Sequence, residues 1–131
     1  MNPGSVGLSV NNAAFQLPLY SSLFAKTAIA SSGLTTTLLV TSAKMQRFSG
    51  TDTHTVVLPV VTTLANGFEF VILNDSTGAV TVQSSGPNTV TTLAAAVGGV
   101  NRGGWGRFIC VDTAGGTGVA SWSYLAGATI L

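Results

Sequence analysis

Charged side chains are the scarcest feature of this sequence of 131 residues. They make up 7% of it, far below the roughly 25% that is typical of soluble domains. The five basic and four acidic residues leave a formal net charge of +1, and the basic residues are scattered along the chain. A groove that follows a phosphate backbone needs clustered lysine and arginine. We therefore expect no nucleic-acid partner.

Long apolar runs are also missing. No run approaches the roughly 20 residues of a membrane-spanning helix. The first 30 residues lack both the basic start and the compact apolar core of a secretory signal. We therefore expect no membrane partner and no export through a signal peptide.

Cysteine and histidine each occur once, as Cys110 and His54. A single cysteine excludes an intrachain disulfide framework, and its apolar, strand-like surroundings predict a buried core residue. Asp52 and His54 would share one face of an extended strand, either as an acid–base pair or, as we favour, as two polar residues on an exposed face. Three copies of His54 around a three-fold axis would be the one route to a metal site.

Catalytic motifs are absent as well. Nucleophilic catalysis needs a nucleophile, a base and an orienting partner, and the sequence offers no such set. The glycine-rich stretch 98–106 lacks the lysine and the following helix of a phosphate-binding loop, so we interpret it as structural. The acidic residues show no pairing of the glycosidase kind, which disfavours a carbohydrate-active enzyme. We expect a protein that is not an enzyme and that uses no cofactor and no small-molecule substrate.

Hydrophobic residues, in contrast, make up 46% of the chain. One interpretation is a β domain rich in threonine, serine and glycine whose hydroxyl groups keep it in solution. The interpretation that we favour is a surface covered by further copies of the chain or by a larger assembly, because interface cores are depleted of charge.

Alternation of apolar and polar residues is clearest in the stretch from 54 to 86. Phe68, Phe70 and Ile72 fall on one side of an extended run, and Val71 falls on the other. Residues 75–78 supply a turn, so we predict a hairpin here. Seven or eight short strands, with turn signals at short intervals and no evident long-range repeat, predict an all-β fold. We expect a small antiparallel sandwich or barrel, jelly-roll-like, with an irregular N-terminal arm.

The chain divides at residue 33 in this interpretation, into an arm (1–33) and a β domain (34–131). The apolar residues of the arm follow no sustained period, although residues 20–29 are compatible with a short helix. The arm either packs onto its own domain or lies on a neighbouring subunit. The candidate contacts with another subunit or with a capsid are Leu17, Leu19, Tyr20, Leu23, Phe24, Leu125, Ile130 and Leu131.

The central stretch also resembles a small β module of tailed-bacteriophage structural proteins. This module is found in tail fibre and spike components and in capsid-bound proteins. The resemblance covers about residues 54–124. It is carried by Val56 to Pro59, Gly67, Phe70 to Ser76, Val80 to Val82, Ser84 to Gly86 and Trp122. Within it, Asn74 is expected to cap or turn the end of the hairpin.

The resemblance implies a structural role in the virion, usually as a homotrimer. Tail fibres are usually long, whereas this chain has 131 residues from Met1 and its first 33 residues look like a docking arm. Both features favour a capsid cement, or decoration, protein whose partner is the major capsid protein on the capsid surface. The alternative is a tail fibre, adaptor or receptor-binding component, in which Arg102 and Trp105 would contact a host glycan.

Overall fold

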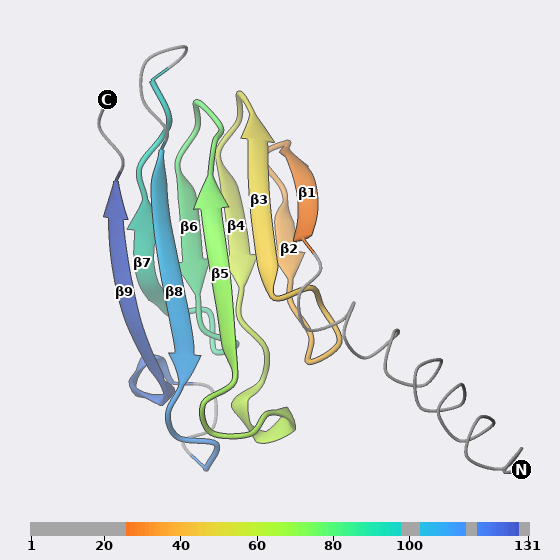
Figure 1. Cartoon of the computed structure of the whole chain (residues 1–131), viewed down its shortest axis with the longest axis vertical. Coiled ribbons are helices and arrows are strands. Elements are labelled where there is room, and N and C mark those ends of the chain that lie inside the picture. The colour runs from red at the N-terminus through yellow and green to blue at the C-terminus, as the bar shows by residue number, and fades with distance from the viewer. Residues whose placement is uncertain (1–25, 98–102, 115–117, 129–131) are drawn as a thin grey trace, which may run out of the picture.

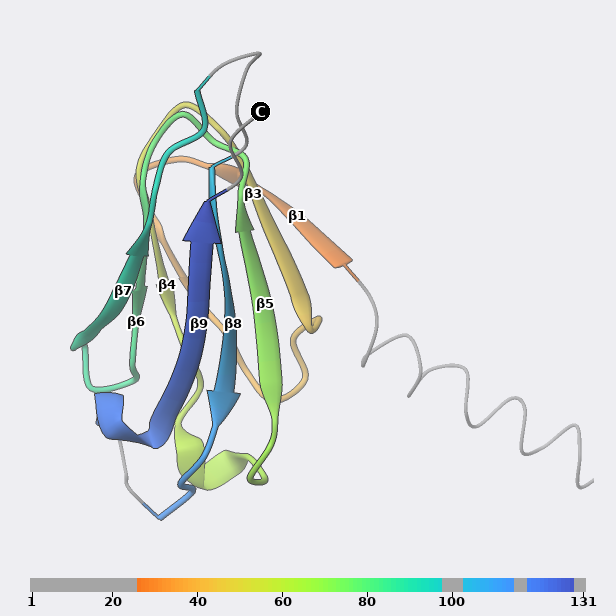
Figure 2. The ribbon, with the colours of Figure 1, turned by 60° about the vertical axis from the view of Figure 1, so that its left-hand side comes forward.

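The chain folds into two β-sheets that lie face to face. The computed structural model describes residues 26–97, 103–114 and 118–128. The five-stranded sheet, sheet A, contains in spatial order β1 (Lys26–Ser31), β3 (Met45–Gly50), β5 (Glu69–Asn74), β8 (Gly104–Cys110) and β9 (Trp122–Ala128). The four-stranded sheet, sheet B, contains β2 (Thr35–Thr37), β4 (His54–Val57), β6 (Val80–Gln83) and β7 (Thr89–Leu93). Figures 1 and 2 show the sheets as two layers, which confirms the predicted all-β, sandwich-like class.

The first six strands alternate between the two sheets. β1, β3 and β5 are parallel neighbours in sheet A, and β2, β4 and β6 are parallel neighbours in sheet B. We call one strand of sheet A together with the next strand of sheet B a rung. β1–β2, β3–β4 and β5–β6 are three such rungs, stacked in chain order. The antiparallel pairs among the described strands are β5–β8, β6–β7 and β8–β9. Two short 3-10 turns, η1 (Val61–Thr63) and η2 (Val119–Ser121), lie in the connections.

This topology corrects two predictions about strand pairing. The hairpin across residues 75–78 is wrong, because β5 and β6 belong to different sheets. The wholly antiparallel, jelly-roll-like arrangement is wrong for the rungs, and the two sheets of the described residues do not close into a barrel. The turn signal was genuine, but the turn carries the chain across to the other sheet instead of back along the same one.

Asn74 holds that crossing in place. Its buried side-chain nitrogen donates to the carbonyl oxygens of Gly78 at 2.9 Å, Leu93 at 3.2 Å and Ala94 at 2.9 Å. Its side-chain oxygen accepts from the backbone N–H of Ser76 at 3.0 Å and lies 2.6 Å from Ser76 Oγ. Asn74 therefore does hold a turn, but at a corner between the two sheets and not at the end of the predicted hairpin.

The rungs reveal an internal repeat that inspection of the sequence missed. The strand register pairs residue 35 with 55 and residue 55 with 81. The segments 35–38, 55–58 and 81–84, which read TTTL, TVVL and TVQS, therefore occupy equivalent places. Their spacing is unequal because the second rung carries the extra loop that contains η1. An unequal spacing hides a short repeat from a search for a fixed period.

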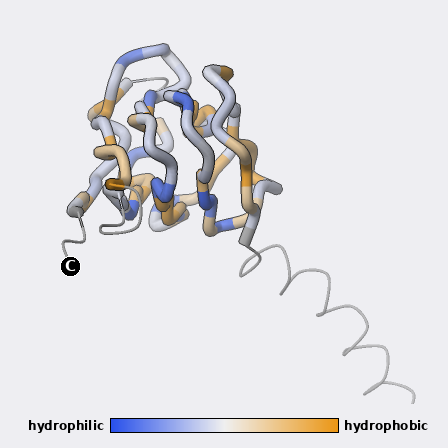
Figure 3. The backbone as a smooth tube through the Cα atoms, turned by 90° about the horizontal axis from the view of Figure 1, so that it is seen from above, coloured by the Kyte–Doolittle hydropathy of each residue, from blue (hydrophilic) through white to orange (hydrophobic). Residues whose placement is uncertain are grey.

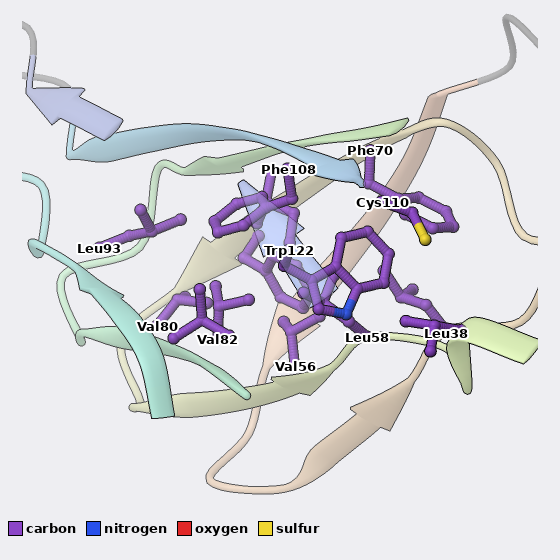
Figure 4. Packing of buried hydrophobic residues seen from close by; sticks show 14 residues of the cluster. Leu38, Val56, Leu58, Phe70, Val80, Val82, Leu93, Phe108, Cys110 and Trp122 are labelled. Atoms are coloured by element: carbon purple, nitrogen blue, oxygen red, sulfur yellow. The ribbon is translucent and has the colours of Figure 1, made fainter. Parts of the chain in front are cut away.

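The hydrophobic core fills the space between the sheets. Along β5 the buried and half-buried residues alternate, which confirms the predicted sidedness of this strand. In Figure 4 the labelled side chains of sheet A, among them Phe108 and Trp122, and those of sheet B, among them Val56, occupy this space. Figure 3 shows hydrophobic and hydrophilic positions succeeding each other along the strands. Cys110 is fully buried in this core, as predicted.

The sandwich begins earlier than the predicted boundary at residue 33. Lys26–Ser31 forms β1, which pairs with β3 over its whole length, so this part of the predicted arm is a strand of sheet A. The possible helix over residues 20–29 is excluded for its described part, residues 26–29. Residues 1–25 lie outside the described residues.

Candidate assembly surfaces

His54 lies in the interior and not on the exposed strand face that the sequence suggested. Its side chain is 4% exposed, and its ring centroid lies 4.9 Å from that of Phe48. Nε2 lies 2.7 Å from the hydroxyl oxygen of Thr36. Burial lowers the pKa of His54, which favours the neutral ring. Asp52 is exposed, so the two side chains do not share a face, and a buried ring cannot meet its copies around a symmetry axis.

The described residues show no group of three or more histidine, cysteine or acidic side chains placed to hold a metal ion. Burial raises the pKa of the Cys110 thiol, which disfavours the reactive thiolate. In the same described part of the chain, no helix is long and apolar enough to span a membrane.

The described part of the glycine-rich stretch serves close packing. A Cβ atom on Gly103 would lie 2.2 Å from the carbonyl oxygen of Asn74 and 2.5 Å from that of Ala94. One on Gly104 would lie 2.7 Å from the backbone nitrogen of Ala94. The absence of side chains here lets β8 pass directly against the end of β7 and the Asn74 corner. Residues 104–106 thus begin β8 and do not belong to the glycine-rich connection that the sequence suggested, whereas residues 98–102, including Arg102, lie outside the described residues.

The outer face of sheet A carries half-buried and exposed apolar side chains on four of its strands. We call it the apolar face, and its residues are Met45, Val71, Leu73, Trp105, Ile109 and Leu125. Register places Met45 beside Val71 and Leu73 beside Trp105, so apolar side chains pair across neighbouring strands. Arg47 and Arg107 stand in the same rows. The ring of Trp105 leans over Gly127, where an added Cβ would lie 3.2 Å from it.

The two arginines of the apolar face are paired within the chain. Arg107 Nη2 lies 2.7 Å from Oε2 of Glu69 on the adjacent strand. Arg47 Nε lies 2.6 Å from Oδ2 of Asp75. At one end of the sheet the ammonium group of Lys44 lies 3.4 Å from the ring centroid of Phe68. Burial lowers the pKa of Lys44, and the nearby Glu69 partly opposes this change. Both arginines on this face are therefore neutralised locally.

The outer face of sheet B is different in character, being uncharged but rich in hydroxyl groups. Register aligns one threonine from each of its four strands in a single row: Thr35, Thr55, Thr81 and Thr92. We call this surface the threonine face. It matches the interpretation in which hydroxyl groups keep a weakly charged β domain in solution, whereas the apolar face matches the interpretation of a covered surface.

Comparison of the sequence with protein-family models and with curated proteins finds no match.

Of the predicted contact residues, the structure describes Leu125, which is 65% exposed on the edge strand β9 and belongs to the apolar face. The other predicted contacts, Leu17, Leu19, Tyr20, Leu23, Phe24, Ile130 and Leu131, lie outside the described residues. Sequence reasoning missed the contribution of Met45, Val71 and Leu73. The available signal was that β5 carries apolar residues on both of its sides, which a strand with one solvated face does not need.

Proposed function

We propose that this protein is a structural subunit of a tailed-bacteriophage virion. In this proposal it is a capsid cement protein that forms a homotrimer and bridges major capsid proteins on the outside of the head. The motif resemblance supports the phage setting. The observation that carries the structural role is the apolar face, whose arginines are already paired within the chain.

The proposed mechanism is burial of apolar surface whose arginines are paired within the chain. A sheet face of five strands measures about 20 Å by 20 Å, or about 400 Å². A stable interface buries roughly 800 Å² on each partner. The apolar face therefore supplies about half of one interface, and further contacts are needed. In the proposal these come from the predicted contacts Leu17, Leu19, Tyr20, Leu23, Phe24, Ile130 and Leu131, and binding to the assembled shell stabilises it by mass action.

The test compares two matched substitutions on opposite faces. Leu125→Asp places a charge on the apolar face, and Thr92→Asp places the same charge on the threonine face. We expect Leu125→Asp to reduce trimer mass in light scattering and to weaken co-sedimentation with purified phage heads at least about tenfold, because a buried unpaired charge is costly. Thr92→Asp should leave both measurements unchanged. Equal effects of the two variants, or a wild-type protein that is monomeric and ignores heads, would contradict the proposal.

A second candidate function follows from Trp105. This half-buried ring on the apolar face offers a flat aromatic surface of the kind that stacks on sugars. Glycan binding that is lost in Trp105→Ala, in a protein without affinity for heads, would favour a tail fibre, adaptor or receptor-binding component.

A further inference from the structure

The first rung leaves an apolar side chain exposed where the later rungs bury the equivalent residue. Register makes residues 34, 54 and 80 equivalent. His54 and Val80 are 4% and 0% exposed, whereas Leu34 is 67% exposed. The difference arises because β4 and β6 have neighbours on both sides, while β2 is the edge strand of sheet B.

Two more apolar residues are exposed at the same end of the stack. Leu39 and Val40, which follow β2, are 60% and 43% exposed. Natural edge strands are commonly protected by a charge, a proline or a bulge, and the three threonines of β2 provide none of these. Leu34 and Leu38 bond to β4 through their backbone, which directs the N–H and C=O groups of Thr35 and Thr37 toward the open edge.

The sequence that precedes β1 contains a short stretch, here called the copy, that ends in the same Leu-Pro pair as residues 58–59. Residues 15–18 read FQLP and residues 56–59 read VVLP. In the rungs, the leucines at this place, Leu38 and Leu58, are 2% and 0% exposed. Eight residues, 18–25, separate the leucine of the copy from the first residue of β1. The connection from Leu38 to Met45, the first residue of β3, is similarly short. The number of residues between the copy and β1 is therefore compatible with one more strand of sheet B before β1.

We propose that residues 14–17 of the chain add a strand to the open edge of β2, parallel to it and in the register of the later rungs. Leu17 then lies beside Leu38, and Phe15 lies on the inner side beside Thr36. The added strand pairs with the outward backbone groups of β2, and the residue before it, Ala13, falls beside Leu34. This inference is independent of the proposed virion role, and it assigns Leu17 to the sandwich while Leu19, Tyr20, Leu23 and Phe24 remain candidates for contacts between chains.

A disulfide test addresses the register directly. The proposal places Gln16 beside Thr37, both facing outward, at the roughly 4.8 Å spacing of neighbouring strands, which suits a disulfide. In a Cys110→Ser background, Gln16→Cys with Thr37→Cys should form an intrachain disulfide on mild oxidation. The matched control is Gln16→Cys with Thr92→Cys, on the opposite edge strand of the same face. We expect the first pair to oxidise at least about tenfold faster, as a monomeric product on a non-reducing gel. Equal rates, or a product that is only intermolecular, would overturn the proposal.

Hydrogen exchange provides a second measurement, made on the chain without cysteine substitutions. The amides of Thr35 and Thr37 should exchange at least about tenfold faster after deletion of residues 1–20, because only the added strand protects them. The amides of β5, which has strands on both sides, should be unaffected and so report an intact sandwich. Unchanged exchange at Thr35 and Thr37 with β5 intact would overturn the proposal. Neither experiment depends on trimer mass or on binding to heads.

Discussion

Asn74 stands where the chain leaves sheet A for sheet B, and one amide group satisfies backbone groups from two segments there. Its partners lie in the crossing itself, at Ser76 and Gly78, and at the end of β7, at Leu93 and Ala94. A buried carbonyl without a donor is costly. The corner therefore depends on a residue that offers both donors and an acceptor in a compact side chain, which is the chemistry of asparagine.

Substitution of Asn74 by alanine should be among the most damaging single changes in the described part of the chain. We expect Asn74→Ala to lower the free energy of unfolding by about 3 kcal/mol, because several buried backbone groups lose their partner. Asn66→Ala is the matched control, since Asn66 is exposed and accepts one hydrogen bond, from the N–H of Thr113. Urea unfolding followed by tryptophan fluorescence measures both. Similar losses in the two variants would refute this role for Asn74.

His54 should make stability depend on pH through a different effect. Burial lowers its pKa in the folded chain, whereas in the unfolded chain it titrates near its ordinary value of about 6.5. The stabilising contribution of the neutral ring is therefore complete above about pH 6.5 and is lost as the pH falls toward the lowered pKa.

We expect the free energy of unfolding to fall by up to about 1.4 kcal/mol per pH unit between about pH 6.5 and pH 5. The comparison is His54→Gln, which removes the one histidine and leaves the acidic residues and the N-terminus in place. Denaturant unfolding at several pH values across this range gives the free energy of unfolding as a function of pH. This free energy should change more steeply with pH in the wild type than in the variant. Equal slopes would exclude His54 as the source.

At the scale of strands, the sequence predicts sidedness better than connectivity. The alternation around Phe70 predicts which residues are buried, because the two-residue period follows from strand geometry alone. It does not determine whether the next strand returns in the same sheet or crosses to the other, because both turns use the same glycine, serine and aspartate residues. That choice depends on partners distant in sequence, such as the carbonyl of Leu93 that Asn74 reaches.

The candidate surface was partly predictable for the same reason. Scarcity of charge indicates a covered surface, and Leu125 was identified from the apolar C-terminal stretch. The apolar face as a whole was not predictable, because it needs β3, β5, β8 and β9 in register. His54 was misplaced because a polar residue after a turn is usually exposed, whereas here it is the inward residue that begins β4 and is paired with Thr36.

The two sheets present faces of unlike character on opposite sides of one core. The threonine face exposes hydroxyl groups to water, while the apolar face exposes carbon and two closed ion pairs. If the apolar face is the one that assembles, its charges need no partner from another subunit. Assembly then depends on hydrophobic burial, which salt screens little, and not on attraction between opposite charges.

The dissociation constant of the oligomer, measured by sedimentation, should accordingly change less than about threefold between about 50 and 500 mM salt. Association should also show a negative heat-capacity change. Glu69→Gln is the informative variant, because it leaves Arg107 unpaired on the apolar face. We expect Glu69→Gln to weaken association about tenfold and to make association salt-dependent. Without its carboxylate partner, the Arg107 charge is either buried unpaired in the interface or repels the like charge of another subunit. A wild-type oligomer that dissociates in salt would instead place charged pairs between subunits, and the apolar face would lose its assigned part in assembly.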